Sequence, residues 1–561
     1  MPDGGAAAPT RGPAGRPTVV VVGGGIAGLA AAWELTGGGG GPGGDAGGPG
    51  GDTPLVIVLE ADNRLGGKLR TERFGNVSLD VGPDGFLARR PEATALCREL
   101  GLDAELEPIG ASGAAVWARG RRRPMPAGLF LGVPTRFLPV ARSGILSPLG
   151  TARLLVDLVA PRPDRRGPLG DRAIGPLVTR KLGRQAVRRL VEPLLGGIYA
   201  GGVSDASAAA VFPPLLQVSQ GRASFMRSMG RLARSGPAAP GPAAPGAPGP
   251  AAPVAPGGPA APGGPGSQEG PDADGGPPAP EPAFFALHDG LASLVDRLAW
   301  ALDQRGVEIR TGCAVTALVP DGGRWRVTTP AGTVDADGVV LAVPARPAAE
   351  LLAPVDADVA ATLQNVAYAS VAVVTMAFPP GALPDNLYGT GLLVPKDTPL
   401  PPASVAALGA PQDERCMVTA CTYLSAKWPH LADADRVLVR ASVGRFGDDR
   451  FWALDDQGLV DRVVGELAGL LDVTARPVAA KVTRWKEALP QYRVHHLLRV
   501  GGVESAARRL GALAVAGAAY RGVGIPACVA SGRSAARVVL GRLRGDAPDP
   551  AGAEEAQPAA P

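Results

Sequence analysis

The stretch "TVVVVGGGIAGLAAAWEL", residues 18–35, decides the fold. A β-branched run (18–22) leads into Gly23-x-Gly25-x-x-Gly28, and an Ala-rich segment follows. This order predicts a buried strand, a tight turn and a helix whose first N–H groups face phosphates. Gly23 permits the turn, Gly25 lets backbone approach a pyrophosphate, and Gly28 lets the helix pack on the strand. We therefore expect a dinucleotide-binding domain.

The acidic partner of such a turn is expected at the end of the next strand. The segment "PLVIVLEA" (54–61) reads as that strand, and Glu60 lies 32 positions after Gly28. This spacing is longer than the usual one of about 20 residues. Most of the additional residues belong to a Gly-rich loop, 37–53, and the entropy cost of closing a loop grows only logarithmically with its length. We expect Glu60 to bind ribose hydroxyls. The alternative is a solvated glutamate at a strand end.

The overall composition limits the classes of function. The 561 residues include 56 basic and 52 acidic side chains, a net charge of +4, which gives no reason to expect nucleic acid as a partner. Five cysteines without tight pairing fit a reducing compartment. The spacing of Cys416 and Cys421 does not suit a zinc site and the four histidines do not complete one, so we expect no metal.

The N-terminal residues 1–16 lack the apolar core of a signal peptide. No run reaches the ~20 apolar residues that span a bilayer. We expect a cytoplasmic protein. The basic and apolar region 119–160, with three arginines at 121–123, leaves open a peripheral contact with the inner face of a membrane, although an ordinary helical subdomain with a charged outer face is better supported.

A second basic, Gly-rich turn follows Glu60 in "EADNRLGGKLRTERFGNVSLDVGPDGF", residues 60–86. It resembles the Glu-x3-Arg-x-Gly-Gly-(Arg/Lys)-x-x-Thr segment of FAD-dependent amine oxidases and their relatives; the matching residues are Glu60, Arg64, Gly66, Gly67, Lys68 and Thr71. Arg64 and Lys68 would supply cations near the pyrophosphate. The alternative is a basic surface turn.

Two more segments are similar to the same FAD pattern. In "TGCAVTALVP" (311–320), the resemblance places Val315 at the adenine, and in "AVAGAAYRGVGIPACVASGRSAA" (514–536), it places a helix N-terminus at the flavin. The resemblance therefore implies FAD. The residues it implies for cofactor binding are Gly23, Gly24, Gly25, Ile26, Ala27, Gly28, Glu60, Ala61, Arg64, Gly67, Lys68, Gly82, Pro83, Asp84, Gly85, Val315, Trp485, Gly522, Val523, Gly524 and Ile525.

Further segments narrow the resemblance. These are "LDVGPDGFLARR" (79–90), "EPLLGGIYAG" (192–201), "CTYLSAKWPH" (421–430) and "RWKEALPQYRVHH" (484–496). They resemble the FAD-dependent protoporphyrinogen and coproporphyrinogen III oxidases, in the Gram-positive version. The resemblance implies oxidation of coproporphyrinogen III to coproporphyrin III in haem biosynthesis, with oxygen as acceptor and hydrogen peroxide released; protoporphyrinogen IX is the alternative substrate. Gly85 and Gly202 depart from the usual Ser and Asp of these segments.

The substrate implied by this resemblance carries propionates, which cations bind. Arg89 and Arg90 are the first candidates for a propionate clamp, with Lys427 a further one. A solvated Arg pair opening a helix is the alternative for the first two, and a structural lysine for the third. We assign no catalytic side chain, since the flavin itself carries hydride transfer. Transient contact with a ferrochelatase and the oligomeric state are left open.

The expected architecture is α/β: a discontinuous Rossmann-like FAD-binding domain with an inserted α+β substrate domain and a helical subdomain. The boundaries are a disordered N-terminus at 1–16, the FAD-binding domain at 17–90, 283–345 and 484–545, a helical cap at 91–234, a disordered Ala/Pro/Gly insert at 235–282, a substrate-binding domain at 346–483 and a disordered tail at 546–561.

Three other functions share part of this pattern. Another flavin amine oxidase-like enzyme or a carotenoid desaturase would carry the FAD motifs without "KWPH" or "ALPQY". A porphyrinogen dehydrogenase would use a different acceptor from oxygen. A flavin-bearing scaffold would bind partners without turnover, and the basic residues beside the flavin segment argue against it.

Overall fold

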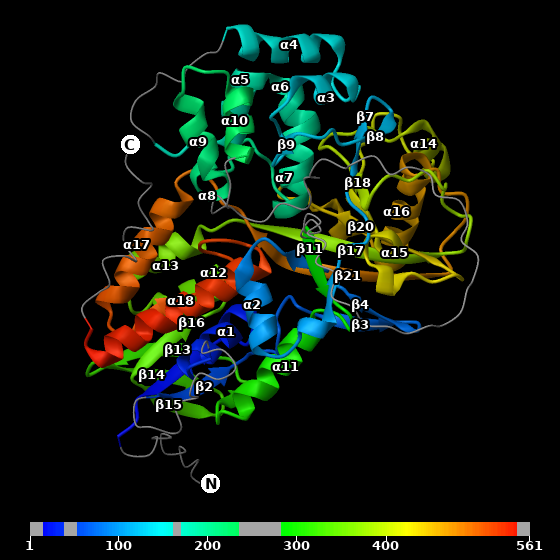
Figure 1. Ribbon diagram of the computed structural model, residues 1–561. Coiled ribbons are helices and arrows are strands. Elements are labelled where there is room, and N and C mark those ends of the chain that lie inside the picture. Colours follow the sequence, from blue (N-terminus) through cyan, green and yellow to red (C-terminus); the bar gives the residue numbers. More distant parts are fainter. Residues whose placement is uncertain (1–14, 39–52, 161–169, 235–281, 547–561) are drawn as a thin grey trace, which may run out of the picture.

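The computed structural model describes residues 15–38, 53–160, 170–234 and 282–546 (Figure 1). The predicted disordered terminus 1–16, the insert 235–282 and the tail 546–561 lie almost wholly outside the described residues, as does most of the Gly-rich loop 37–53. The exact domain boundaries stay a prediction.

A five-stranded parallel sheet forms the lower part of the molecule in Figure 1. From edge to edge it consists of β12 (Glu308–Arg310), β2 (Leu55–Leu59), β1 (Thr18–Val22), β16 (Gly338–Leu341) and β22 (Leu513–Val515). Every neighbouring pair is parallel. The strands come from three separate segments of the chain, and the expected α/β class is confirmed.

Both faces of this sheet are covered, which explains its uniformly apolar strands. Val19 and Val21 face one layer and Val20 and Val22 the other, because successive strand side chains point to opposite faces. The first layer is α1 (Ile26–Leu35), α2 (Pro91–Glu99), α11 (Ala292–Asp303) and α18 (Ile525–Arg544). The second is the sheet β13 (Ala317–Asp321), β14 (Arg324–Thr329) and β15 (Gly332–Ala336), with α12 (Ala345–Leu352), α13 (Ala357–Gln364) and α17 (His496–Arg509).

A seven-stranded sheet lies beside this domain. Its order is β21 (Ala479–Pro490), β17 (Tyr368–Phe378), β20 (Val437–Val443), β19 (Val418–Tyr423), β18 (Gly391–Leu393), β7 (Ala115–Ala118) and β8 (Arg121–Pro124). Helices α14 (Pro402–Leu408) and α16 (Asp456–Leu470) pack on it. Residues 115–124, which we assigned to the helical cap, instead extend this sheet, because β7 pairs in parallel with β18. Strand β21 likewise carries the 484–490 part of the segment we gave to the FAD-binding domain into this sheet.

The helical cap lies at the top of Figure 1. It consists of α3 (Phe137–Arg142), α4 (Pro148–Val159), α5 (Ile174–Leu182), α6 (Arg184–Ala186), a π-helical turn (Val187–Val191), α7 (Glu192–Tyr199), α8 (Ala208–Val211), α9 (Pro213–Gln220), α10 (Phe225–Arg234) and the hairpin β9 (Leu129–Phe130)–β10 (Val133–Pro134). The buried Asp157 carboxylate accepts hydrogen bonds from Ser224 and from the N–H groups of Phe225 and Met226, which fixes the start of α10 against α4.

Two small antiparallel sheets connect these parts. One is the hairpin β3 (Thr71–Phe74)–β4 (Val77–Asp80), and the other places β11 (Phe284–Leu287) between β5 (Phe86–Leu87) and β6 (Leu106–Pro108). Across all the described ranges, no helix is both long enough and apolar enough to cross a bilayer.

Candidate active site

The first glycine turn has the geometry that its sequence predicts. Gly23 has a φ of +106°, a conformation that side chains disfavour. A Cβ on Gly28 would lie 1.9 Å from the Gly23 carbonyl oxygen, so only glycine lets α1 approach the turn this closely. A Cβ on Gly25 would meet no protein atom within 4 Å. Gly23 and Gly28 therefore close the turn, while Gly25 faces free space.

Glu60 follows β2, and its carboxylate binds the backbone of the first glycine turn. Its carboxylate accepts one hydrogen bond from the Gly24 N–H at 2.6 Å and another from the Asp62 N–H at 2.8 Å. The backbone of Glu60 also accepts from the Cys313 N–H at 2.8 Å, which brings the half-buried Val315 close to the same strand end. Each carboxylate oxygen keeps a further acceptor site, so the expected ribose contact stays a prediction.

The second glycine turn lies directly against the first. Gly66 forms a β-bridge with Gly25 and donates its N–H to the Gly24 carbonyl at 2.8 Å. The Arg64 guanidinium donates to the carbonyls of Leu65, Gly67 and Leu69. Arg64 thus holds the second turn in shape, and its expected role as a cation near the pyrophosphate stays a prediction.

Lys68 points in the opposite direction, towards β21. Its ammonium donates to the carbonyls of Glu487 and Ala488, and burial lowers its pKa. The Glu487 carboxylate and the Cys528 thiol lie near enough to act on that charge. Glu487 has a φ of +50°, so the strand bends where Lys68 is bound. Lys68 therefore joins the second glycine turn to β21.

The segment from Gly82 to Gly85 rests on a buried network of charges. The Arg440 guanidinium donates to the Gly82 carbonyl, and the Trp485 indole donates to the Val81 carbonyl at 2.9 Å. Burial alone would raise the pKa of Asp84, but Lys427 and Arg440 outweigh it and hold that pKa well below its usual range. The segment is thus fixed through charges from strands distant in the sequence.

Asp80 belongs to the same network. Burial raises its pKa to about 6, although the Thr71 hydroxyl and the Leu291 N–H both donate to its carboxylate. Gly85 is equally confined, since a Cβ there would lie 2.8 Å from a ring atom of Trp428. A side chain at this position would therefore require the Trp428 ring or the Phe285 carbonyl to move.

The three substrate-binding candidates have different surroundings. The Lys427 ammonium lies 2.9 Å from the Asp84 carboxylate, and Trp428 donates to the same oxygen at 3.2 Å, so Lys427 supports the Gly82–Gly85 segment, and its contact with a substrate stays a prediction. Arg90 forms a two-pronged pair with Glu92. Arg89 is exposed, and no ion pair reaches it within the part of the chain that the structure describes.

The C-terminal motif starts α18. Gly524 precedes the helix and offers no side-chain cap, so the first N–H groups of α18 stay available. A Cβ on Gly532 would lie 2.0 Å from the Ala27 carbonyl oxygen, which shows how closely α18 packs on α1. Gly522 is buried, and Val523 packs against the core of the cap. Both glycine turns and this motif therefore lie together at the carboxyl ends of the parallel strands, the region that we call the crevice.

Tyr492 and His496 support this motif through contacts that the sequence does not show. Tyr492 donates its hydroxyl to the Ala518 carbonyl at 2.6 Å, and its ring stacks on His496 at 4.0 Å. The His496 ring nitrogen bonds the Tyr520 carbonyl at 2.7 Å, and burial lowers the pKa of His496 to about 4. These two hydrogen bonds join positions 26 and 24 residues apart, so the segment "QYRVHH" alone could not predict them.

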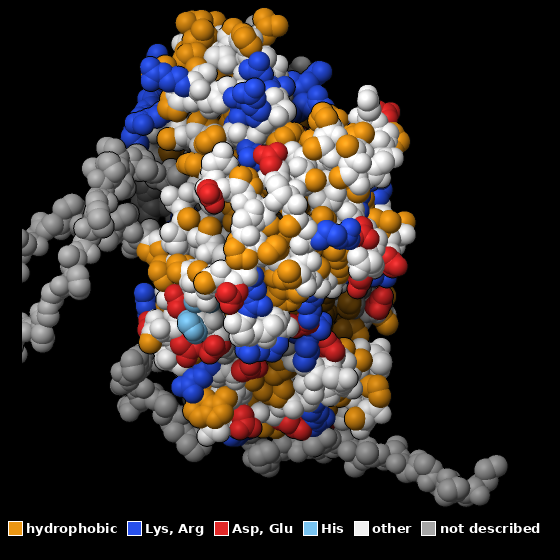
Figure 2. Space-filling model, turned by 90° about the vertical axis from the view of Figure 1, so that its right-hand side faces the viewer, with side chains coloured by type: hydrophobic (Ala, Val, Ile, Leu, Met, Phe, Trp, Pro, Cys, Tyr) orange, Lys and Arg blue, Asp and Glu red, His pale blue; other side chains and the backbone are white. Residues whose placement is uncertain are grey.

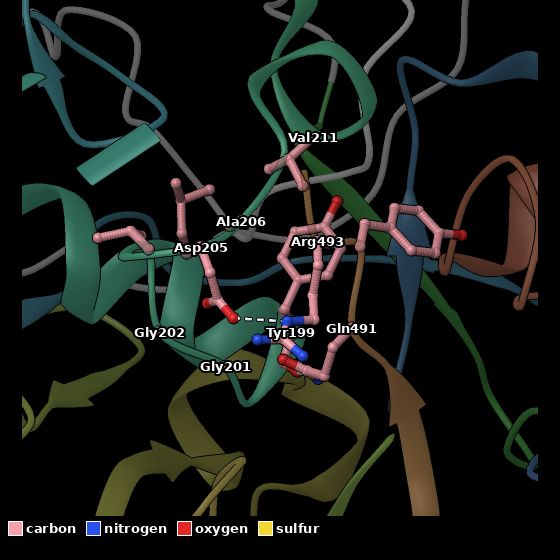
Figure 3. Close-up of a pocket in the computed structure, with 11 residues that line it drawn as sticks. Tyr199, Gly201, Gly202, Asp205, Ala206, Val211, Gln491 and Arg493 are labelled. Atoms are coloured by element: carbon pink, nitrogen blue, oxygen red, sulfur yellow. Dashed lines mark hydrogen bonds and ion pairs between the residues drawn. The ribbon is translucent and has the colours of Figure 1, made fainter. Parts of the chain in front are cut away.

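A small cavity lies where the cap meets this motif (Figure 3). It encloses about 20 Å³, room for a water molecule and not for a macrocycle. Its walls come from α7, the loop after it and residues 491–493 beyond β21, and Arg493 and Asp205 pair across it at 2.7 Å. The Tyr199 hydroxyl is buried at this place without a hydrogen-bond partner among the described residues.

The residues of the crevice fit an FAD dinucleotide. A Cβ on Gly25 or on Gly517 would meet no protein atom within 4 Å, so the backbone is open to a ligand at both positions. The N-termini of α1 and α18 both lack a side-chain cap, which suits phosphate and polar ring atoms. The donors are backbone N–H groups, and no group of three metal-ligating side chains occurs within the described ranges.

Comparison with known proteins agrees with this geometry. The family of flavin containing amine oxidoreductases matches residues 26–540. The chain is 35% identical to coproporphyrinogen III oxidase of Propionibacterium freudenreichii, covering 93% of this chain and 90% of that one. It is 30% identical to the enzyme of the same name from Bacillus subtilis, covering 93% and 97%.

A solved structure is similar over the same length. The crystal structure of a provisionally assigned protoporphyrinogen oxidase from Exiguobacterium sp. 255-15 superposes with a TM-score of 0.74 at 29% identity, covering 93% of this chain and 98% of that one. The family match, the full-length relatives and the shared fold lead to one conclusion. The chain belongs to the flavin containing amine oxidoreductases and is an FAD-dependent oxidoreductase.

Proposed function

We propose that this protein oxidises coproporphyrinogen III to coproporphyrin III in haem biosynthesis, with molecular oxygen as the acceptor. Six hydrogen atoms leave the substrate, and three oxygen molecules become three hydrogen peroxide. The observation that carries the proposal is the similarity, over nearly the whole chain, to coproporphyrinogen III oxidases at 30% and 35% identity.

The roles of the crevice residues follow from their positions. When bound, FAD supplies the acceptor for hydride from the substrate. Gly25 and Gly67 would let backbone approach the pyrophosphate, Glu60 would bind ribose, and Val315 would contact the adenine. Gly82–Gly85, Trp485 and the start of α18 would line the flavin, with Arg64 and Lys68 holding the turns that carry it. The protein's own contribution is orientation and the exclusion of water.

Among the substrate-binding candidates, Arg89 is the one that we retain as a direct contact. It is an exposed cation three residues after β-strand-forming Phe86, beyond the segment expected to touch the flavin. Its guanidinium stays charged at neutral pH. Arg90, paired with Glu92, would add positive charge beside Arg89. Lys427 would contribute indirectly, by holding the Asp84 carboxylate.

Aerobic turnover tests the proposal. The purified protein should be yellow, and addition of coproporphyrinogen III should produce porphyrin fluorescence together with peroxide. Protoporphyrinogen IX is the second candidate substrate, because the superposed Exiguobacterium structure is assigned to its oxidation. A yellow protein that is inert towards both porphyrinogens and active on an amine would contradict the proposal and favour another flavin amine oxidase-like activity.

The proposal includes attachment to an anionic membrane surface through the cap. Figure 2 shows hydrophobic side chains gathered at the top of the molecule, with Lys and Arg side chains below them. The most exposed apolar residues there are Leu149 (83%) and Val159 (80%) of α4 and Leu138 (52%) of α3. Arginines near an apolar helix favour anionic lipid. Contact with a ferrochelatase stays a prediction.

Vesicle sedimentation tests this attachment. The protein should sediment with vesicles containing phosphatidylglycerol and less with pure phosphatidylcholine. Replacing Leu149 and Val159 by Ser should lower the bound fraction several-fold. The matched control is Val478→Ser, an exposed apolar residue (69%) outside the cap. Equal sedimentation of the double variant and the control would contradict attachment through α4.

A further inference from the structure

Positive charge exceeds negative charge at the seam between α7 and the seven-stranded sheet. Glu192 begins α7, Lys396 and Asp397 follow β18, and Arg445 follows β20. The Phe446 N–H donates to the Ala200 carbonyl at 2.6 Å, which holds the end of α7 against the loop after β20. These side chains therefore come from three elements that meet in one place.

Two of the acids at this seam are already neutralised. Asp448 forms a two-pronged pair with Arg450, at 2.8 and 2.9 Å. Asp397 pairs with Arg415 and, at 3.5 Å, with Arg188. The hydrogen bonds and ion pairs of both carboxylates therefore go to other arginines.

Arg445 and Lys396 remain without such a partner. No hydrogen bond or ion pair reaches either side-chain cation from any residue that the structure describes. Arg445 is half-buried, and burial lowers its pKa, although Asp448, Glu192 and Asp397 all act on it from a distance. A guanidinium that loses water without gaining acceptors is destabilised until an anion binds it.

Glu192 is the opposing group. It is half-buried, burial raises its pKa, and no donor among the described residues bonds its carboxylate. Its nearest charges include Lys396, Arg445 and Arg188. Glu192 thus partly offsets the two cations and competes with any anion that approaches them.

Gly202 links the seam to the small cavity beside the C-terminal motif. A Cβ on Gly202 would lie 3.9 Å from the Glu192 carboxylate, and Gly202 also lines the small cavity of Figure 3. Tyr492 lines that cavity too and bonds Ala518 of the C-terminal motif. A few side chains therefore separate the unpaired cations from the flavin end of the crevice.

We propose that Arg445 and Lys396 form a carboxylate-binding site for a propionate group of the substrate. The inference rests on the proposed function and adds the residues that favour a porphyrinogen with four propionates over one with two. Glu192 lowers the affinity of the site, because its own carboxylate competes with the propionate for the two cations.

Binding of coproporphyrin III to the holoenzyme tests the site without turnover. Titration should show that Arg445→Gln and Lys396→Gln each weaken binding about tenfold, which corresponds to ~1.4 kcal/mol. The same substitutions should weaken the binding of protoporphyrin IX, which has two propionates, by a smaller factor. Glu192→Gln should tighten coproporphyrin binding a few-fold, a change of opposite sign. Arg509→Gln, an exposed cation on α17, is the matched control and should bind as the wild type does.

The outcomes separate the two proposals. Flavin absorbance and melting temperature establish that each variant is folded. If the wild type binds coproporphyrin III and Arg445→Gln and Lys396→Gln bind it equally well, the carboxylate site is wrong and the proposed function stands. If Glu192→Gln weakens binding as Arg445→Gln does, the cluster is structural and the site is also wrong. If the wild type neither binds coproporphyrin III nor oxidises coproporphyrinogen III, both proposals fail.

Discussion

The charged side chains of the glycine crevice have partners within the protein, whereas two cations at the seam beside α7 have none among the described residues. In the crevice, Glu60, Arg64, Lys68 and Asp84 each have partners within the protein. At the seam, Arg445 has none among the described residues. A cofactor that stays bound suits a site whose own groups are already fixed, whereas a charged substrate that enters and leaves suits cations without internal partners. The predictions below test how rigid the first region is compared with the second.

The largest expected effect comes from adding one methyl group inside the first glycine turn. Gly28→Ala would place a Cβ 1.9 Å from the Gly23 carbonyl oxygen, which backbone cannot accommodate without shifting the turn. We expect loss of bound flavin and destabilisation of more than about 3 kcal/mol. Flavin absorbance of the purified protein and thermal unfolding measure both.

The matched change is Gly501→Ala in α17, where a Cβ would meet no protein atom within 4 Å. A helical glycine in open space should gain about 0.5–1 kcal/mol of stability when replaced by alanine. Normal flavin content in Gly28→Ala would mean that the turn is not packed as described.

The next effect compares a buried carboxylate with an exposed one. Asp84→Asn leaves Lys427 and Arg440 without their carboxylate inside the network, and removing one member of a buried pair costs about 3–5 kcal/mol. Asp397→Asn removes an exposed partner of Arg415 at the seam and should cost less than about 1 kcal/mol. Chemical unfolding of both variants measures the difference; equal costs would remove the contrast between the two regions.

The smallest effect depends on pH. The pKa of His496 is about 4 in the folded protein, below its usual value near 6.5, so the unfolded chain binds more protons between these values. Stability from this group is therefore complete above about pH 6.5 and is lost as the pH falls towards 4, by about 2 kcal/mol at pH 5.

His496→Gln should lack this loss between pH 7 and pH 5. Asp80, whose pKa of about 6 acts in the opposite direction, contributes equally to both proteins and cancels in the difference. The control is His495→Gln, which replaces a neighbouring exposed side chain. Its stability should fall between pH 7 and pH 5 as that of the wild type does. A wild-type slope in His496→Gln would show that this ring is not held neutral.

The sequence predicted the crevice where its contacts are local. Gly23, Gly25 and Gly28 fall within six residues, and a β-branched strand before them leaves one geometry for the turn. Glu60 could be found across the Gly-rich loop because a strand end must return to the same sheet edge. The family resemblance then named the cofactor from the second and third motifs.

The remaining contacts could not be predicted because they depend on distant partners. Lys427 and Asp84 are separated by 343 positions, and no spacing rule reveals that they pair. The sheet edge formed by β7 and β8 was missed because its parallel partner β18 lies in another segment. Arg440 carried no motif of its own, although it holds the Gly82 carbonyl.

The measurement that tests the central claim most directly is the ratio of initial rates on the two porphyrinogens. Under air, the holoenzyme should oxidise coproporphyrinogen III faster than protoporphyrinogen IX and release three hydrogen peroxide for each coproporphyrin III. Faster oxidation of protoporphyrinogen IX would contradict the assigned substrate, and porphyrin formation without peroxide would contradict oxygen as the acceptor.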